Sequence, residues 1–252
     1  MKDSLAPEMF LKWRVRDDDP NAVEILGIFR RADRTEMTEL TVPEMIAGKR
    51  VVAIGARAFC RCSSLTAIKL PKGLRKIGGF AFKDCLSLPS IKLPKGLQEI
   101  GGYAFEHCPS LTSVLLPEGL TEIGAHAFWK CSSLTSILLP DGLTSIGEGA
   151  FWGCSSLTSI HLPDGLTSIG EGAFWGCSSL TSIDLPNGLK KIDEWAFLGC
   201  RALASVSLPE SVKKIGDDAF KDCLETCVFH ARAGSYAHRW AIDAGLRVET
   251  RE

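Results

Sequence analysis

Hydrophobic and polar positions recur along this chain with a period of 23 residues. The repeating unit reads x-x-I-G-x-x-A-F-x-x-C-x-x-L-x-x-I-x-L-P-x-x-L. Its phenylalanine stands at the same position in successive units, as Phe59, Phe82, Phe105, Phe128, Phe151, Phe174, Phe197 and Phe220. A fixed period of about 20 to 50 residues is typical of solenoids, in which one unit buries its apolar face only against its neighbours. The pattern therefore predicts a stacked array.

Within each unit the stretch L-x-x-I-x-L has the alternation of a short strand. In Leu134–Leu139, Ile137 and Leu139 share one side, and Ser136 and Leu138 share the other. Such alternation predicts one buried and one exposed face, and the following proline ends the strand because it cannot donate to a ladder. We expect a parallel sheet of about nine short strands and, from a spacing of ~4.8 Å, a curved rod ~40 Å long.

The other half of the unit carries small and aromatic residues at a different spacing. Ala150, Phe151 and Cys154 stand at positions i, i+1 and i+4. This spacing is typical of a helical or 3-10 turn whose small and aromatic side chains point inward. The predicted fold class is therefore an α/β repeat, with strands on one side of the solenoid and short turns on the other.

Both ends of the repeat array are expected to be capped. Residues 1–36 hold two apolar runs around the turn-rich cluster at 17–21, which predicts a hairpin cap closing the first unit's open edge. Residues 37–231 are the solenoid, with eight full or near-full units after a half unit that begins at Met37. The last unit is interpreted as two residues short, with Cys227 and Phe229 at strand positions.

The C-terminal segment 232–252 is predicted to be a helical cap, and the three segments to form one structural domain. Gly234 and Ser235 open a helix that extends to Ala244, with Tyr236 and Trp240 facing the core. A cap with a polar outer face keeps the end of a solenoid soluble.

The unit IGxxAFxxCxxLxxIxLPxxL resembles the BspA-like class of leucine-rich repeats, which is found in bacterial and protist surface proteins. The resemblance covers the units from 37 to 231, and the terminal GSYAHRWAIDAGL resembles that family's C-terminal cap. It implies a leucine-rich-repeat solenoid, adhesion or host-protein binding, and no enzymatic activity. A cell-surface or secreted location follows from the resemblance, although MKDSLAPEMF lacks the apolar core of a signal peptide. An intracellular, cytoplasmic interaction scaffold remains the alternative.

Charge and cysteine spacing narrow the possible functions. A net charge of −1 gives no general attraction to nucleic acid or to anionic membranes, and no apolar run approaches the ~20 residues of a membrane span. Eight of the ten cysteines recur every 23 residues, and no CxxC pair occurs. We therefore interpret them as buried thiols and expect no metal, no cofactor and a monomeric scaffold for a protein ligand.

The exposed strand positions are the first candidate binding surface. The column between the strand isoleucine and leucine varies, whereas the core positions beside it do not. We call it the strand column, and it comprises Lys69, Lys92, Leu115, Leu138, His161 and Asp184. Solubility alone does not require two adjacent exposed leucines. Contact with a partner is the preferred interpretation, and an ordinary solvated face is the alternative.

A second candidate surface comes from the turns. We call it the aromatic stripe, and it comprises Phe80, Tyr103, His126, Trp129, Trp152 and Trp175. Residues three apart on a turn are neighbours, and aromatic side chains are enriched at interfaces. The interpretation preferred here is structural, with each tryptophan covering the backbone of Gly153 or Gly176.

Two further groups contain residue types that are used in catalysis. Ser159, His161 and Asp184 fall on neighbouring strands, but Ser159 lies ~6.6 Å along its strand from His161, too far for a catalytic triad. Cys60 occupies the column later used by Trp129, and Arg57 and Arg61 are expected to stabilise its thiolate. No catalytic residue is assigned.

Overall fold

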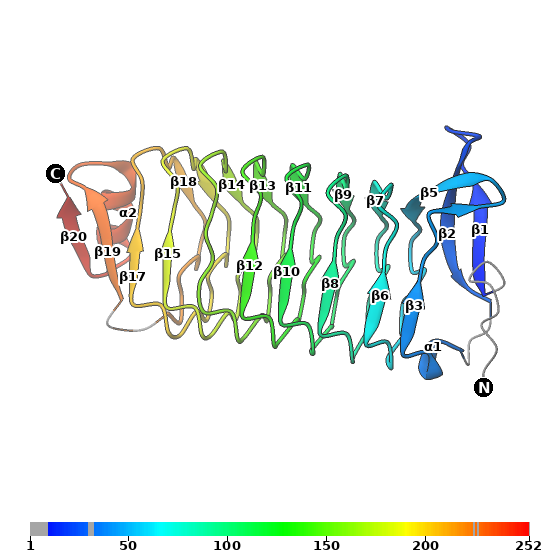
Figure 1. Cartoon of the computed structure of the whole chain (residues 1–252). Helices are drawn as coiled ribbons and strands as arrows, with labels where there is room; N and C mark the ends of the chain where they lie inside the picture. Colours follow the sequence, from blue (N-terminus) through cyan, green and yellow to red (C-terminus); the bar gives the residue numbers. More distant parts are fainter. Residues whose placement is uncertain (1–9, 30–32, 224, 226, 252) are drawn as a thin grey trace.

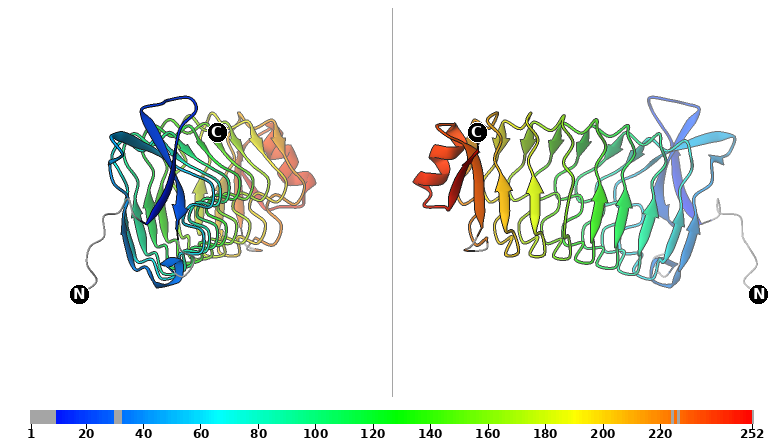
Figure 2. Two further views of the ribbon diagram at one scale, coloured as in Figure 1. Left: turned by 90° about the vertical axis from the view of Figure 1, so that its right-hand side faces the viewer. Right: turned by 60° about the vertical axis from the view of Figure 1, so that its left-hand side comes forward.

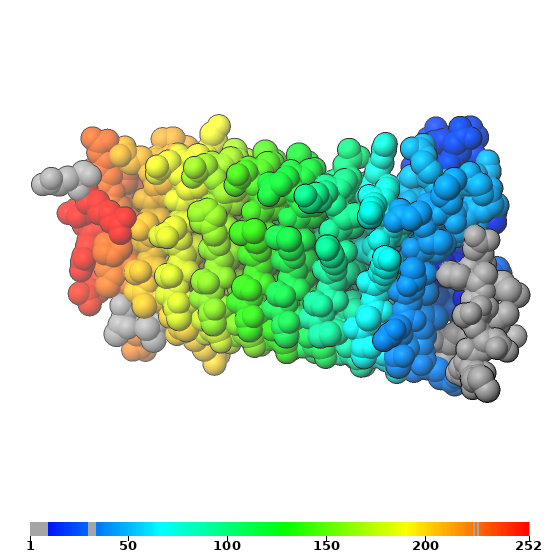
Figure 3. All heavy atoms as spheres, viewed as in Figure 1, coloured from blue at the N-terminus to red at the C-terminus, as the bar shows by residue number. Residues whose placement is uncertain are grey.

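The computed structural model describes residues 10–29, 33–223, 225 and 227–251. Figure 1 shows the units stacked side by side in sequence order, from the blue N-terminal hairpin to the red C-terminal cap. The views in Figure 2 show one continuous solenoid, and in Figure 3 each unit forms a band across the visible face. The predicted solenoid is confirmed. The expectations for 1–9, 30–32, 224, 226 and 252 lie outside the described residues.

The predicted strands stack as a parallel row, which we call the first ladder, and its hydrogen-bonded pairing is interrupted between β6 and β8. Its members are β3 (Glu39–Thr41), β6 (Ala67–Lys69), β8 (Ser90–Lys92), β10 (Ser113–Leu115), β12 (Ser136–Leu138), β15 (Ser182–Asp184), β17 (Ser205–Ser207) and β19 (Val228–Arg232). Between β12 and β15, His161 forms single bridges to Leu138 and Asp184. Equivalent residues pair in register, such as Leu115 with Leu138. The half unit at Met37 begins this ladder, because β3 pairs with β6.

A second parallel ladder, which the sequence did not predict, runs through the Ile-Gly segments. It contains β5 (Lys49–Ile54), β7 (Lys76–Ile77), β9 (Glu99–Ile100), β11 (Glu122–Ile123), β13 (Ser145–Ile146), β14 (Ser168–Ile169), β16 (Lys191–Ile192) and β18 (Lys214–Ile215). Between β9 and β11, the N–H of Gly124 donates to Ile100 O at 3.3 Å. Most of these strands have two residues, too few for alternation to indicate a strand.

The turns differ from the predicted helical or 3-10 turns. Phe80 and Asp84 have positive φ angles of 58°, and most units repeat this pair of left-handed residues. Lys83 N donates to Phe80 O within the unit at 3.2 Å, whereas Phe82 N donates to Ala104 O of the next unit at 2.7 Å. Because alternate donors bond to the neighbouring unit, no run of helical bonds forms, and the described residues from 37 to 223 contain no helix.

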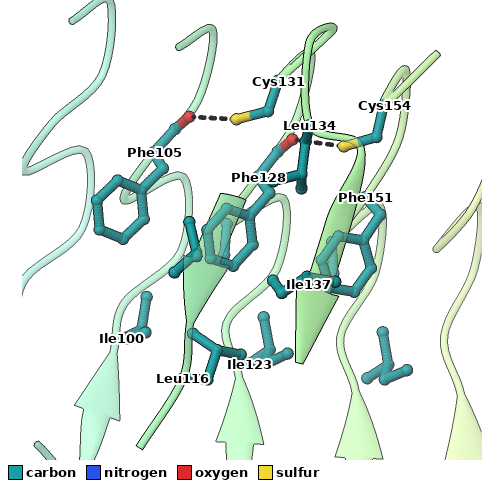
Figure 4. Close-up of a cluster of buried hydrophobic side chains, with 14 of the residues drawn as sticks. Ile100, Phe105, Leu116, Ile123, Phe128, Cys131, Leu134, Ile137, Phe151 and Cys154 are labelled. Carbon is teal, nitrogen blue, oxygen red and sulfur yellow. Dashed lines mark hydrogen bonds between the residues drawn. The ribbon is translucent and has the colours of Figure 1, made fainter. Parts of the chain in front are cut away.

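A column of phenylalanine rings runs through the core. From Phe59 to Phe220, successive ring centroids lie 4.9 to 5.6 Å apart. Figure 4 shows three of these rings with the cysteines beside them: Cys131 Sγ donates to Phe105 O at 3.1 Å, and Cys154 Sγ donates to Phe128 O at 3.3 Å. All ten cysteines are free thiols, among them the eight that recur with the repeat and were predicted to be thiols. Each unit therefore bonds to its neighbour through backbone, ring and thiol.

The N-terminal cap is the predicted hairpin, in which β1 (Leu11–Val15) pairs antiparallel with β2 (Ala22–Ile28). The hairpin closes the second ladder, since β2 pairs with β5. It does not close the edge of the predicted strand ladder, where β3 pairs only with β6 among the described residues. The short helix α1 (Asp33–Glu36) precedes β3, and β4 (Met45–Ile46) pairs with β5.

The C-terminal cap contains the predicted helix α2 (Tyr236–Asp243), with Ser235 as its N-cap and Ala237 and Ala241 buried. Tyr236 and Trp240 pack against the core. A further strand that was not predicted, β20 (Val248–Arg251), pairs with β19. The expectation of a shortened last unit was wrong, because Phe229 pairs with Val206 and so keeps the 23-residue period.

Replacing a ring of the phenylalanine column tests the coupling between units. Phe151→Ala should lower the free energy of unfolding by ~3–5 kcal/mol, because truncating a buried ring leaves a cavity. Hydrogen exchange should show the loss of protection concentrated in the units that contain Phe128, Phe151 and Phe174, since units couple mainly to neighbours. The control, Leu138→Ala, removes an exposed side chain and should change stability by less than ~0.5 kcal/mol. A uniform loss of protection would contradict this account.

Alkaline pH tests the buried thiols. Burial raises the pKa of the Cys154 and Cys177 thiols well above the ordinary value of a thiol. It raises the pKa of Cys62 and of Cys223 to about 12. The unfolded chain binds fewer protons than the folded one between pH 9 and 12, so stability is fully present below about pH 9 and falls as pH rises. The slope from each thiol should rise to ~1.4 kcal/mol per pH unit only well above pH 9, where the thiol of the unfolded chain is fully ionised.

Urea titrations at pH 8, 9 and 10 measure this slope. Cys154→Ala should reduce the mean slope over this range by roughly 0.7 kcal/mol per pH unit, because the thiol of the unfolded chain is only half ionised at pH 9. A free energy of unfolding that stays constant between pH 8 and 10 would show that the thiols are not held protonated by the fold.

Candidate binding surfaces

The strand column forms a continuous exposed row on the first ladder. Parallel pairing in register places Lys92, Leu115 and Leu138 next to one another, and the bridges of His161 continue the row to Asp184. The six predicted residues are all exposed. Leu115 and Leu138 expose 64% and 54% of their surface. Strand pairing and the bridges therefore join Lys92 to Asp184 in one row, and Lys69, whose strand does not pair with β8, lines the same groove as Lys92.

A groove lies at the lysine end of this row. It encloses about 730 Å³, and its apolar lining comes from Ile68, Leu70, Leu93 and Pro94. Lys69 and Lys92 line it together with Lys72 and Lys95. Glu44 also lines the groove, but its carboxylate accepts the backbone N–H of Lys72 at 3.0 and 3.1 Å. The sequence period predicts where each lysine lies on the solenoid. It does not predict the groove, because the groove depends on how the Leu-Pro turns pack.

Charge along the strand column changes from basic to acidic. Lys69 and Lys92 stand at one end, His161 and Asp184 at the other, and the two leucines lie between them. Among the described residues, these four polar side chains form no ion pair. A ligand crossing the row would meet unpaired charges on either side of an apolar centre.

The aromatic stripe is also brought together as predicted. The Phe80 and Tyr103 rings stack at 4.7 Å and Tyr103 and His126 at 4.6 Å, while His126 meets Trp129 at 5.6 Å. Trp129, Trp152 and Trp175 follow one another at 5.4 and 4.2 Å. Trp195 extends the stripe, 6.1 Å from Trp175. Trp195 was not among the residues predicted for the stripe, although it stands 23 residues after Gly172 in the column of Phe80.

Stacking covers the ring faces of the stripe. Trp152 and Trp175 are nearly parallel, at 5°, and so are Phe80 and Tyr103, at 3°. Lys130 lies over the ring of Trp129, with its Nζ 5.2 Å from the centroid. A sugar or an aromatic side chain needs a free face to stack on. This arrangement favours packing within the protein over ligand binding.

The tryptophan rings do not cover the backbone of Gly153 and Gly176 as expected. The tryptophans pack on one another, and the closest glycine contact is at Gly149, where an added Cβ would overlap the His126 ring. Phe80, Tyr103 and His126 have left-handed backbones, with φ of 58°, 59° and 55°. This conformation costs about 1 kcal/mol or more per residue, which the stacking of the rings helps to offset.

The interpretation of Cys60 needs correction. Burial, followed by the charge of Asp84, raises the pKa of this thiol above its ordinary value, and the opposing effects of Arg61 and Arg34 are smaller. The expected stabilisation of the thiolate was therefore wrong. The sequence showed the arginines but not Asp84, which lies one unit away.

The described residues contain no group of three or more histidine, cysteine, aspartate or glutamate side chains placed to hold a metal ion. None of the helices in the described ranges is long and apolar enough to cross a membrane. Ser159, His161 and Asp184 are exposed on the strand face.

Comparison with known proteins agrees with this architecture. A leucine-rich repeat protein of T. pallidum is 31% identical, with a TM-score of 0.58 over 68% of this chain and 88% of that one. A leucine-rich repeat protein of Eubacterium ventriosum (20% identity, TM-score 0.54, covering 89% and 71%) and the pneumococcal vaccine antigen PcpA (18%, 0.52, covering 86% and 68%) share the fold.

None of the curated proteins matches the chain significantly in sequence. The family described as BspA type leucine-rich repeat region matches residues 33–140 and 121–233, in six copies. Together these matches extend over most of the solenoid and include the 23-residue units. The chain therefore belongs to the BspA-type leucine-rich-repeat family.

Proposed function

We propose that this protein is a non-enzymatic binding scaffold whose protein ligand lies across the strand column. The observation that carries the proposal is the pair Leu115 and Leu138, adjacent in the ladder and more than half exposed. The same strands bury Val114 and Ile137. The fold therefore requires the apolar side chains on the inner face and leaves the outer face free to vary.

The leucine pair has the properties of an interface centre. Interface energy concentrates in a few side chains that become dry on binding. Burial of one leucine side chain contributes roughly 1.5–3 kcal/mol. The pair can therefore supply much of the affinity of a modest interface, while the polar residues around it set the orientation of the ligand.

The unpaired charges indicate what kind of protein segment fits. An acidic stretch of the ligand would meet Lys69 and Lys92 at the groove, and a basic group would meet Asp184. Such complementarity increases the rate of association and fixes the orientation of the ligand. The strand column therefore suits a segment with an apolar centre and opposite charges at its ends.

The aromatic stripe is the second-choice surface. Its residues are Phe80, Tyr103, His126, Trp129, Trp152 and Trp175. Their stacking accounts for the pattern without a ligand, as the covered faces of Trp152 and Trp175 show.

The proposed setting is adhesion at a bacterial surface or in a secreted protein, with a host or matrix protein as ligand. This setting is supported by family membership, because repeats of this class are scaffolds associated with surface proteins. An intracellular interaction scaffold is the second candidate, favoured by ten free thiols, which are common in reducing compartments. Labelling intact producing cells with an impermeant biotin reagent distinguishes the two.

A double substitution tests the strand column. Leu115→Ser with Leu138→Ser should leave stability nearly unchanged, because neither side chain supports the core. Binding to a partner captured from a panel of purified extracellular-matrix and host-cell proteins should weaken by about 2 kcal/mol, roughly 30-fold in Kd. The control, Leu86→Ser with Ile242→Ser, removes two exposed apolar side chains elsewhere and should bind normally.

The rival surface requires its own variant. Replacing Trp129, Trp152 and Trp175 by alanine should lower stability, because it removes a stacked column. If this variant stays folded and loses binding while the leucine variant binds normally, the ligand lies on the turns and the strand column is a solvated face.

A further inference from the structure

A basic pocket lies at the N-terminal end of the solenoid, apart from the strand column. It encloses about 740 Å³ between the hairpin cap, α1 and the turns of the first two full units. Lys12 comes from β1, Arg34 from α1, and the turns add Arg57, Arg61 and Lys83. Ligand pockets typically measure about 300–1,000 Å³. Segments far apart in the sequence therefore place five cations around one hollow of suitable size.

The pocket carries excess positive charge. Among the residues that the structure describes, no aspartate or glutamate lines it. Arg61 reaches Asp84 at 3.7 Å and Lys83 reaches Glu106 at 2.7 Å, both outside the lining. Within the described part of the chain, Lys12, Arg34 and Arg57 have no carboxylate partner. Three positive charges therefore face the pocket without a counterion from the described residues.

The guanidinium of Arg34 is bound by a backbone carbonyl of the first full unit. In the inner units, the carbonyl equivalent to Cys60 O accepts an N–H from the preceding unit, as Lys83 O does from Arg61 N. The first full unit has no such neighbour, and Arg34 Nη1 donates to Cys60 O at 2.7 Å instead. A Cβ at Gly27 would lie 3.0 Å from Arg34 Nη2, so the hairpin also packs closely against this group.

Two of the other cations rest on an aromatic ring. The guanidinium of Arg57 lies 5.0 Å from the Phe80 centroid and Lys83 Nζ lies 5.7 Å from it, while Tyr103 stacks on the same ring. Such contacts restrict the side chains before any ligand binds. Cations held in place in this way bind an anion with less loss of conformational freedom.

An apolar side chain completes the lining. Phe29 exposes 57% of its surface and lies in the pocket beside Lys12. Arginine forks match the oxygens of phosphate and sulfate groups. We propose that this pocket binds a small organic phosphate or sulfate ester, with its tetrahedral oxyanion between Arg34, Arg57 and Lys12 and its organic part against Phe29. This site is independent of the proposed protein ligand.

Calorimetric titration of the full chain tests the proposal, with phenyl phosphate, phenyl sulfate and the uncharged benzyl alcohol at constant ionic strength. At least one ester should bind with submillimolar Kd, and benzyl alcohol should not. Tighter binding of the phosphate or of the sulfate identifies which ester the pocket prefers. Lys12→Gln with Arg57→Gln should weaken the preferred ester at least tenfold, because both side chains are exposed and face the anion.

The matched control is Arg201→Gln, an exposed arginine outside the pocket, which should bind within twofold of the natural protein. Cys60 lines the pocket, so the preferred ester should also slow its labelling by a maleimide in the unmodified sequence, a readout that needs no variant. Undetectable binding of both esters at millimolar concentration, equal binding of benzyl alcohol, or unchanged affinity in a folded double variant would overturn the proposal.

Discussion

The structure depends on one constraint, namely that every unit must lie directly above its neighbour in the same register. The phenylalanine rings meet at 4.9 to 5.6 Å, close to the spacing of hydrogen-bonded strands. Ring stacking and backbone bonding are therefore satisfied at the same repeat distance. The thiol that donates to the preceding unit, such as Cys154 to Phe128 O, fits only if this register holds. The two ladders, the phenylalanine column and the cysteine column therefore all share the same repeat distance.

The same constraint separates residues that build the rod from residues that can recognise a ligand. Because the units are in register, equivalent outward side chains of successive units lie one strand spacing apart. A ligand on this face therefore contacts a row of side chains. Leu115 and Leu138 are exposed although the buried positions beside them already satisfy the core. The aromatic stripe is different, since its rings stack and accompany left-handed backbones at Phe80 and Tyr103. The ends of the array are different again, because some backbone groups of an end unit have no neighbouring unit to bond with. At the N-terminal end, Arg34 donates a hydrogen bond to one such group, the carbonyl of Cys60.

Much of this architecture could be predicted from sequence because the period makes each residue's environment repeat. The strand column, the aromatic stripe and the free thiols follow from aligning the units. Features with no periodic signal could not be predicted. Two-residue strands such as Lys76–Ile77 are too short to show alternation, and the left-handed residues replaced the expected helical turns. The raised pKa of Cys60 comes from burial and then from Asp84 in the next unit, and the basic pocket requires the hairpin to lie beside Arg57 and Phe80.

We propose that recognition takes place on the strand column of an otherwise uniform rod. Hydrogen exchange of the chain with and without its captured protein ligand tests it most directly. Ligand-induced protection should centre on β8, β10 and β12 and leave the turns at 126–130 and 149–153 unchanged. Protection centred on those turns, with the three strands unaffected, would contradict it.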